Sequence, residues 1–134
     1  RLIRSAREVN DNKPHRIVER VTRLADRFKH AVVACYGLTY KPDVDDLRES
    51  PALQIVEALA ERNIALRVCE PALARLPTTL SERSNVELVD AARAQREADI
   101  VVFLVGHRQF KRLDPNQFLN KVVVDAIGLI SRRA

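Results

Sequence analysis

Two cations, an aromatic ring and the start of a helix occur together in residues 37–51 of this chain. Lys41 and Arg48 flank an acidic stretch, and Tyr40 precedes the lysine. Pro51 suits the first position of a helix, where unpaired backbone N–H groups and the helix dipole favour an anion. The combination predicts a phosphate-binding segment in which the Tyr40 ring packs on a base or a sugar.

Four acidic residues in the same segment allow two other interpretations. They could neutralise Lys41 and Arg48 in structural ion pairs, or three of them could hold Mg²⁺ in a phosphatase-like site. Such a phosphatase needs its nucleophilic aspartate directly at the strand end, whereas the first aspartate of this segment lies seven residues after Tyr36. We therefore expect the acids to orient Arg48 and to pair with N–H groups of the loop. The acids are Asp43, Asp45, Asp46 and Glu49.

Short apolar runs alternate with amphipathic stretches along the chain. The apolar runs predict strands at residues 31–36, 64–69, 86–89, 100–105 and 122–124. Helices are predicted at 2–11, 14–28, 51–62 and 90–97, with a short one from Asp114-Pro115, while residues 72–84 fit no single element. This alternation is typical of an α/β fold with a parallel sheet covered on both faces. We expect a Rossmann-like, doubly wound sheet of about five or six strands, preceded by the end of a long helix.

In a doubly wound sheet, ligands bind beyond the carboxyl ends of the strands, where the strand order reverses. Residues 37–51 follow the first predicted strand and are long for a strand-to-helix connection, which is typical of a functional loop. Gly37 stands alone, without the G-x-G-x-x-G pattern of a dinucleotide-binding turn. The fold thus places the predicted phosphate segment at the ligand-binding edge.

Composition excludes several classes of protein. The net charge of +5 favours anionic partners, but aromatic residues make up only 4%, which leaves no stacking platform for nucleic acid. No apolar run reaches the length of a membrane span and no signal peptide is visible, so we expect a cytoplasmic protein without a membrane partner. The sequence has no methionine and begins within a helical pattern, which predicts a piece of a longer chain.

Five other polar or reactive residues are expected to have structural roles. Cys35 and Cys69 lie in apolar runs and are predicted to be reduced core thiols. Glu70 ends the second strand, where an acid could bind a ribose hydroxyl, but a turn role is favoured without a glycine fingerprint. His107 is assigned to a loop or helix start, and Asp125 to a strand-end turn. No catalytic residue and no metal ligand is predicted in this chain.

Residues 37–52 resemble the signature of the C-terminal, UDP-binding domain of the UDP-glucose/GDP-mannose dehydrogenase family. They read Gly-Leu-Thr-Tyr-Lys-Pro-Asp-Val-Asp-Asp-Leu-Arg-Glu-Ser-Pro-Ala. The Lys-Pro and Arg-Glu-Ser-Pro forms are most similar to the N-acetylhexosamine branch, and closest to the UDP-N-acetyl-D-mannosamine dehydrogenases. Residues 6–15, 105–111 and 123–126 match that branch in order and spacing, so the resemblance covers essentially the whole chain.

The resemblance implies an activity for the parent protein and roles for three residues. The family oxidises the C6 alcohol of a nucleotide sugar to a carboxylate, with NAD as cofactor and a cysteine that carries covalent intermediates. It implies that Tyr40 and Lys41 contact the UDP-sugar and that Arg48 reaches NAD. The product would be UDP-N-acetyl-mannosaminuronate for surface polysaccharides. The alternatives are a UDP-N-acetylglucosamine or UDP-glucose 6-dehydrogenase and, in another class, a non-catalytic Rossmann-type nucleotide-binding module.

The resemblance also implies a division of the chain and two departures from the family. Residues 1–29 resemble the end of the central dimerisation helix and residues 30–134 the UDP-binding domain. Upstream NAD-binding and central domains and a second copy of the parent are therefore the expected partners. The Gly-rich segment with the nucleophilic cysteine is missing, so we expect this chain alone to be inactive. Many members carry a UDP-sugar-binding arginine at the position of Ile127, a charge that Arg132 or Arg133 could supply here.

Overall fold

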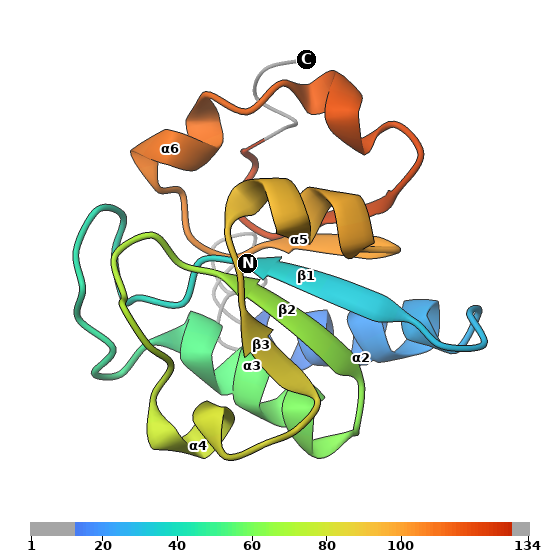
Figure 1. The fold of residues 1–134 in the computed structure, drawn as a ribbon, viewed down its shortest axis with the longest axis horizontal. Coiled ribbons are helices and arrows are strands. Elements are labelled where there is room, and N and C mark those ends of the chain that lie inside the picture. Colours follow the sequence, from blue (N-terminus) through green and yellow to red (C-terminus); the bar gives the residue numbers. More distant parts are fainter. Residues whose placement is uncertain (1–12, 130–134) are drawn as a thin grey trace, which may run out of the picture.

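The computed structural model describes residues 13–129, which form a five-stranded parallel sheet with helices on both faces (Figure 1). The strands are β1 (Val32–Tyr36), β2 (Ala65–Cys69), β3 (Val86–Leu88), β4 (Ile100–Phe103) and β5 (Val122–Asp125). The helices are α2 (Lys13–Ala25), α3 (Pro51–Glu61), α4 (Thr78–Ser81), α5 (Ala91–Glu97), α6 (Arg108–Lys111) and the 3₁₀ helix η1 (Pro115–Phe118). The predicted α/β, Rossmann-like fold is confirmed, whereas the helix predicted at 2–11 lies outside the described residues.

The strand order is β3-β2-β1-β4-β5, and all four neighbouring pairs are parallel. Tyr36, the last residue of β1, is in register with Cys69 of β2 and with Phe103 of β4. The chain first builds outward from β1 to β3, then crosses back to continue with β4 on the other side of β1. The order therefore reverses between β1 and β4, which is where a doubly wound sheet opens a ligand crevice.

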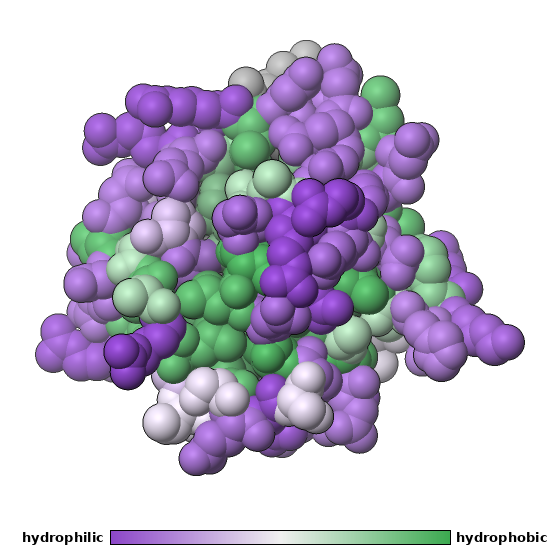
Figure 2. All heavy atoms as spheres, in the orientation of Figure 1, coloured by the Kyte–Doolittle hydropathy of each residue, from purple (hydrophilic) through white to green (hydrophobic). Residues whose placement is uncertain are grey.

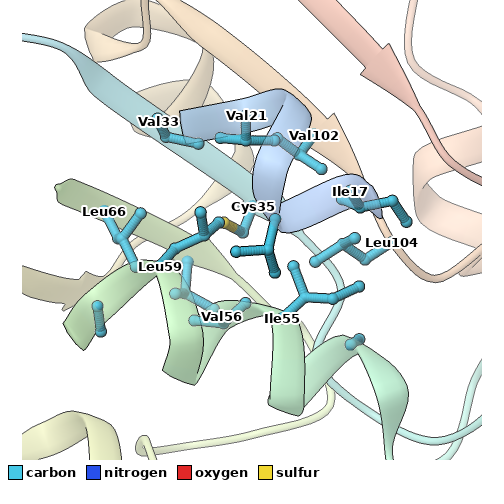
Figure 3. Packing of buried hydrophobic residues seen from close by; sticks show 14 of the residues in the cluster. Ile17, Val21, Val33, Cys35, Ile55, Val56, Leu59, Leu66, Val102 and Leu104 are labelled. Atoms are coloured by element: carbon cyan, nitrogen blue, oxygen red, sulfur yellow. The ribbon is translucent and has the colours of Figure 1, made fainter. Parts of the chain in front are cut away.

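Helices α2 and α3 cover one face of the sheet (Figure 3). Alternate residues of a strand point to opposite faces, so Val33 and Cys35 enter this core. Figure 3 shows them beside Ile17 and Val21 of α2 and Ile55, Val56 and Leu59 of α3. Because α2 shares this core with the sheet, it packs as part of the same body. The division of the chain near residue 29 stays a prediction.

Helix α5 and the segment that carries α6 and η1 cover the opposite face. Tyr36 is fully buried there, and its ring centroid lies 4.9 Å from that of Phe103. Phe110 of α6 and Phe118 of η1 meet the Tyr36 ring edge-on, at 5.3 and 5.9 Å. These aromatic contacts fix the position of α6, a short helix that borders the carboxyl edge of the sheet.

Hydrophilic residues cover most of the face shown in Figure 2, and apolar residues emerge between them near its middle. Within residues 13–129, no helix is both long and apolar enough to cross a membrane.

Strand β4 is shorter than the apolar run that predicted it. The run extends to Val105, but the strand ends at Phe103. The amides of Leu104 and Val105 both donate to the carbonyl of Tyr36, at 2.9 and 3.3 Å, so the chain bends directly after β4, beside the end of β1. The bend turns these two residues toward the crevice between β1 and β4. Other boundaries agree within a few residues, and the unassigned stretch 72–84 contains α4.

Candidate functional site

A cavity of about 790 Å³ lies at the carboxyl edge of the sheet, between the ends of β1 and β4. This volume is ordinary for a small-molecule site. One wall is the loop after β1, with Thr39 and Tyr40, and the first turn of α3. The other is formed by residues that follow β4 and β5, which are Leu104, Val105, Gly106 and Lys111 together with Ala126 to Leu129. The cavity therefore occupies the crevice that the topology predicts.

Gly37 holds the loop against the end of β4. Its φ of +106° is one that other residues rarely adopt, and its amide donates to the carbonyl of Cys69 at 3.0 Å. A Cβ at this position would lie 2.6 Å from the Cβ of Val105. Only glycine allows the loop to leave β1 this close to the neighbouring strand.

The carboxylate of Glu70 organises the start of the same loop. Its Oε1 accepts the amides of Leu38 at 2.7 Å and Thr39 at 3.2 Å, and its Oε2 accepts the amide of Ala72 at 2.9 Å. Glu70 is 2% exposed. Burial raises its pKa, but hydrogen bonds from His107, Ala72 and Leu38 outweigh this effect, so the pKa lies below its usual value. Glu70 thus shapes its own turn, as predicted. It also fixes the loop after β1, residues 37–50, which we call the ligand loop.

His107 completes this arrangement from the other side of β1. Its Nδ1 accepts the backbone amide of Asp43 at 2.7 Å, so the ring hydrogen is on Nε2 and is donated to Glu70 Oε1 at 2.9 Å. The Thr39 hydroxyl lies 3.3 Å from the same Nε2 and donates to the carbonyl of Lys41. His107 precedes α6, as expected, but it also ties together the segments that follow β1, β2 and β4.

Tyr40 lines the cavity, and Lys41 lies beside it. Tyr40 is about half exposed, and its amide donates to the carbonyl of Asp46 at 2.7 Å, which folds the loop back on itself. The Lys41 ammonium lies 5.6 Å from the centre of the Tyr40 ring, within range of a cation–π contact. Of the three predicted site residues, Tyr40 therefore lines the cavity, whereas Lys41 lies beside the Tyr40 ring and is not itself a lining residue.

Arg48 is separate from the cavity wall. Its side chain is 88% exposed, and its guanidinium binds both carboxylate oxygens of Asp46 at 3.1 Å. The hydrogen bonds from Arg48 lower the pKa of Asp46, and the ion pair raises that of Arg48. The interpretation in which an acid neutralises or orients Arg48 is confirmed.

The loop acids are directed at different cations. Asp43 accepts the amide of Arg108 at 2.9 Å and lies 3.7 Å from its guanidinium, whereas Asp46 faces Arg48. In the part of the chain that the structure describes, no three metal-ligating side chains converge. The arrangement gives the magnesium phosphatase alternative no support.

Ser50 begins α3 as predicted. Its hydroxyl donates to the carbonyl of Leu38 at 2.7 Å and accepts the amide of Leu53 at 3.1 Å. Pro51 has no amide hydrogen, so Ala52 is the first-turn residue with an N–H available to a ligand. The helix start offers fewer unpaired donors than the sequence suggested, because its own cap uses one of them.

Both cysteines are buried free thiols, as predicted. Cys35 packs under α2 and α3, whereas Cys69 lies on the opposite face of the sheet. Their positions on opposite faces exclude a disulfide without rearrangement of the strands. Burial raises the pKa of each thiol to about 12, which disfavours the nucleophilic thiolate.

The cavity also contains residues that sequence reasoning did not select. Lys111, at the end of α6, lines the wall opposite the loop, as do Ile127 and Leu129. Ile127 therefore lies where the resemblance implied an arginine, while Arg132 and Arg133 lie outside the described residues. Asp125 has the predicted turn role, since it accepts the amide of Leu129 at 2.8 Å. In the sequence, Lys111 follows the end of a predicted strand but is far from residues 37–51. Its position at the cavity could therefore not be predicted from spacing.

Comparison with known proteins agrees with this geometry. Residues 34–132 match the UDP binding domain of the UDP-glucose/GDP-mannose dehydrogenase family. A Ralstonia nicotianae protein named NDP-N-acetyl-D-galactosaminuronic acid dehydrogenase is 47% identical over 99% of this chain and 31% of its own length. A Campylobacter jejuni UDP-N-acetyl-D-mannosamine dehydrogenase is 45% identical over 82% of this chain and 27% of its own length.

A solved structure extends the match to three dimensions. The UDP-N-acetyl-mannosamine dehydrogenase of Staphylococcus aureus superimposes with a TM-score of 0.71 at 32% identity, over 96% of this chain and 30% of that protein. This chain thus spans about a third of the length of the relatives it matches. It belongs to the UDP-glucose/GDP-mannose dehydrogenase family, of which it is the UDP-binding domain.

Proposed function

We propose that this chain binds the UDP portion of a UDP-N-acetylhexosamine for a cytoplasmic, NAD-dependent 6-dehydrogenase. The observation that carries the proposal is the cavity between the ends of β1 and β4, which is lined by Tyr40 and Lys111 and has Lys41 beside the Tyr40 ring. Its apolar lining suits a base and a ribose, and Lys41, beside the Tyr40 ring, suits a phosphate. Tyr40 and Lys41 are the proposed contacts to the UDP-sugar.

UDP-N-acetyl-D-mannosamine is the proposed substrate of the parent, which would form the mannosaminuronate for a surface polysaccharide. The relatives of that name at 41–45% identity support this choice. An N-acetylgalactosamine-type sugar is a second candidate because the Ralstonia nicotianae protein is 47% identical across almost the whole chain. Residues beyond this chain are expected to discriminate between the sugars.

NAD does not fit this domain in the usual Rossmann manner. The loop after β1 lacks a glycine-rich turn, and the carboxylate at the end of β2 is fully occupied. Glu70 has four N–H partners inside the protein, so it has no capacity for a ribose hydroxyl. We infer that the parent holds NAD on its upstream domain and that Arg48 reaches it across the interdomain cleft. The high exposure of Arg48 is compatible with that role.

The proposed assembly follows from the same reasoning. Residues 1–29 would continue the central helix through which the parent dimerises, and the upstream domains would supply the catalytic cysteine. The buried thiols of Cys35 and Cys69 do not replace it. We therefore expect no oxidation of a UDP-sugar by this chain alone.

An NMR titration of the 134-residue chain with UDP tests the proposal. UDP should shift the resonances of Thr39, Tyr40 and Ala126, around the cavity. Lys41→Ala should weaken binding about tenfold or more, because a charge-assisted hydrogen bond to phosphate contributes about 1.5–3 kcal/mol.

Lys29→Ala is the matched control. Lys29 is exposed and precedes β1, at the opposite edge of the sheet, so its loss removes the same charge away from the cavity. Equal weakening by the two variants, or shifts confined to the amino edge, would contradict the proposed site. Reduction of NAD⁺ by this chain with a UDP-sugar would contradict its expected inactivity.

A further inference from the structure

The wall opposite the ligand loop contains a cation that no motif assigned. Among the described residues that line the cavity, Lys111 is the one with a charged side chain. It ends α6, whose position is fixed by the packing of Phe110 against Tyr36. The remaining lining is largely apolar, so the electrostatic field of this wall is dominated by a single ammonium group.

The position of Lys111 relative to Ile127 is defined by Gly106. A Cβ built on Gly106 would have the Lys111 Cε at 3.8 Å and the Ile127 Cδ1 at 3.4 Å. The two side chains therefore converge on one patch of the wall, where the glycine leaves room. The aliphatic stem of Lys111 packs on this patch, and the residue as a whole is exposed, as is typical of a lysine that keeps its ammonium in solvent.

No carboxylate within residues 13–129 forms an ion pair with Lys111, unlike the neighbouring Arg108, which lies 3.7 Å from Asp43. The pKa of Asp43 is lowered mainly by the backbone hydrogen bond from Arg108, and the charges of Arg108, His107 and Lys111 contribute less. Lys121, by comparison, is committed to the carbonyl of Ala98 at 2.6 Å. Lys111 is thus a cavity-lining cation that protein acids leave available for an anion.

Resting on the function proposed above, we propose that Lys111 contacts the diphosphate of the bound nucleotide, from the wall opposite Lys41. An ammonium group on a flexible stem suits phosphate oxygens, which are its preferred partners. The contact also explains how this wall neutralises an anion although Ile127 is apolar. Lys111 would then distinguish a nucleoside diphosphate from an uncharged nucleoside.

The test compares uridine, UMP and UDP by NMR titration of the 134-residue chain and of Lys111→Met. Methionine keeps most of the stem and removes the charge. UDP affinity should fall about tenfold to a hundredfold, which corresponds to one lost charge-assisted hydrogen bond. Uridine affinity should change less than about twofold, since uridine carries no phosphate.

Arg112→Met is the matched control, because Arg112 is the exposed neighbour of Lys111 and does not line the cavity. It should leave UDP affinity nearly unchanged, and Lys111→Arg should retain it. Adding Ile127→Arg to Lys111→Met should restore part of the loss, because both side chains reach the same patch. The amide spectrum of each variant checks that the fold is intact.

The outcomes separate this inference from the function on which it rests. If UDP binds normally but Lys111→Met behaves like Arg112→Met, the assignment of Lys111 fails and UDP binding stands. An equal loss of uridine and UDP also overturns the assignment, because Lys111 would then shape the cavity without contacting phosphate. Failure of the unaltered chain to bind UDP overturns both.

Discussion

The imidazole Nε2 of His107 lies 2.9 Å from Oε1 of Glu70, and each residue is 2% exposed. His107 follows β4 and Glu70 follows β2, so their hydrogen bond spans the start of the loop that leaves β1 between them. Each of the two side chains accepts a hydrogen bond from a backbone amide of that loop: Glu70 from Leu38, and His107 from Asp43. The conformation of the ligand loop is therefore set by two buried side chains that do not themselves line the cavity.

Replacing Glu70 by glutamine should lower the free energy of unfolding by about 1–3 kcal/mol, the cost of a buried donor left without an acceptor. The side-chain NH₂ of the glutamine would face backbone N–H groups that donate to the carboxylate of Glu70 in the unaltered chain. Urea denaturation measures the change. Glu82→Gln, at an exposed site, should change it by less than about 0.5 kcal/mol. Equal effects of the two variants would show that the network adds no stability.

The contribution of Glu70 should depend on pH. Its folded pKa lies below the ordinary value of 4.5, so the unfolded chain takes up a proton first as the pH falls. The stabilisation is complete above about pH 5 and is lost as the pH falls through the folded pKa. The difference in unfolding free energy between the unaltered chain and Glu70→Gln should therefore be constant near neutrality and shrink below about pH 4.5. A difference that grows toward acid would reverse the assigned direction.

Gly37 and Gly106 should respond differently to replacement by alanine. Gly37→Ala places a methyl group 2.6 Å from the Cβ of Val105 at a φ of +106°, and should cost about 3 kcal/mol or more of unfolding free energy. Gly106→Ala meets Ile127 at 3.4 Å without a positive φ, and should change stability by less than about 1 kcal/mol. Thermal or urea unfolding checks both, and a tolerated Gly37→Ala would refute the close approach of the loop to β4.

Arg48→Ala should leave the isolated domain almost unchanged. Its ion pair with Asp46 is exposed, and such pairs contribute about 0–1 kcal/mol. UDP affinity should also be preserved, because the guanidinium does not line the cavity. In the full-length parent, the same variant should raise the KM for NAD more than that for the UDP-sugar. Loss of UDP binding by the isolated variant would place Arg48 in the wrong site.

The sequence by itself determined the elements and the place of the site. Apolar runs of strand length, Ser50-Pro51 as a helix start and the long loop after the first strand are local signals, and each predicted its element because propensity and burial pattern agree there. The family followed from residues 37–52 for the same reason: the motif is contiguous. Tyr40 and Lys41, the proposed contacts to the UDP-sugar, lie within this motif.

The tertiary structure alone decided which distant residues complete the site. Lys111 and Ile127 reach the cavity, and Glu70 and His107 fix the loop, because parallel strands bring their carboxyl ends to one edge whatever their separation in sequence. It also showed that Arg48 faces Asp46 and solvent, a choice between partners that spacing cannot make. Local sequence encodes backbone preference, whereas side-chain partnership depends on which strands become neighbours.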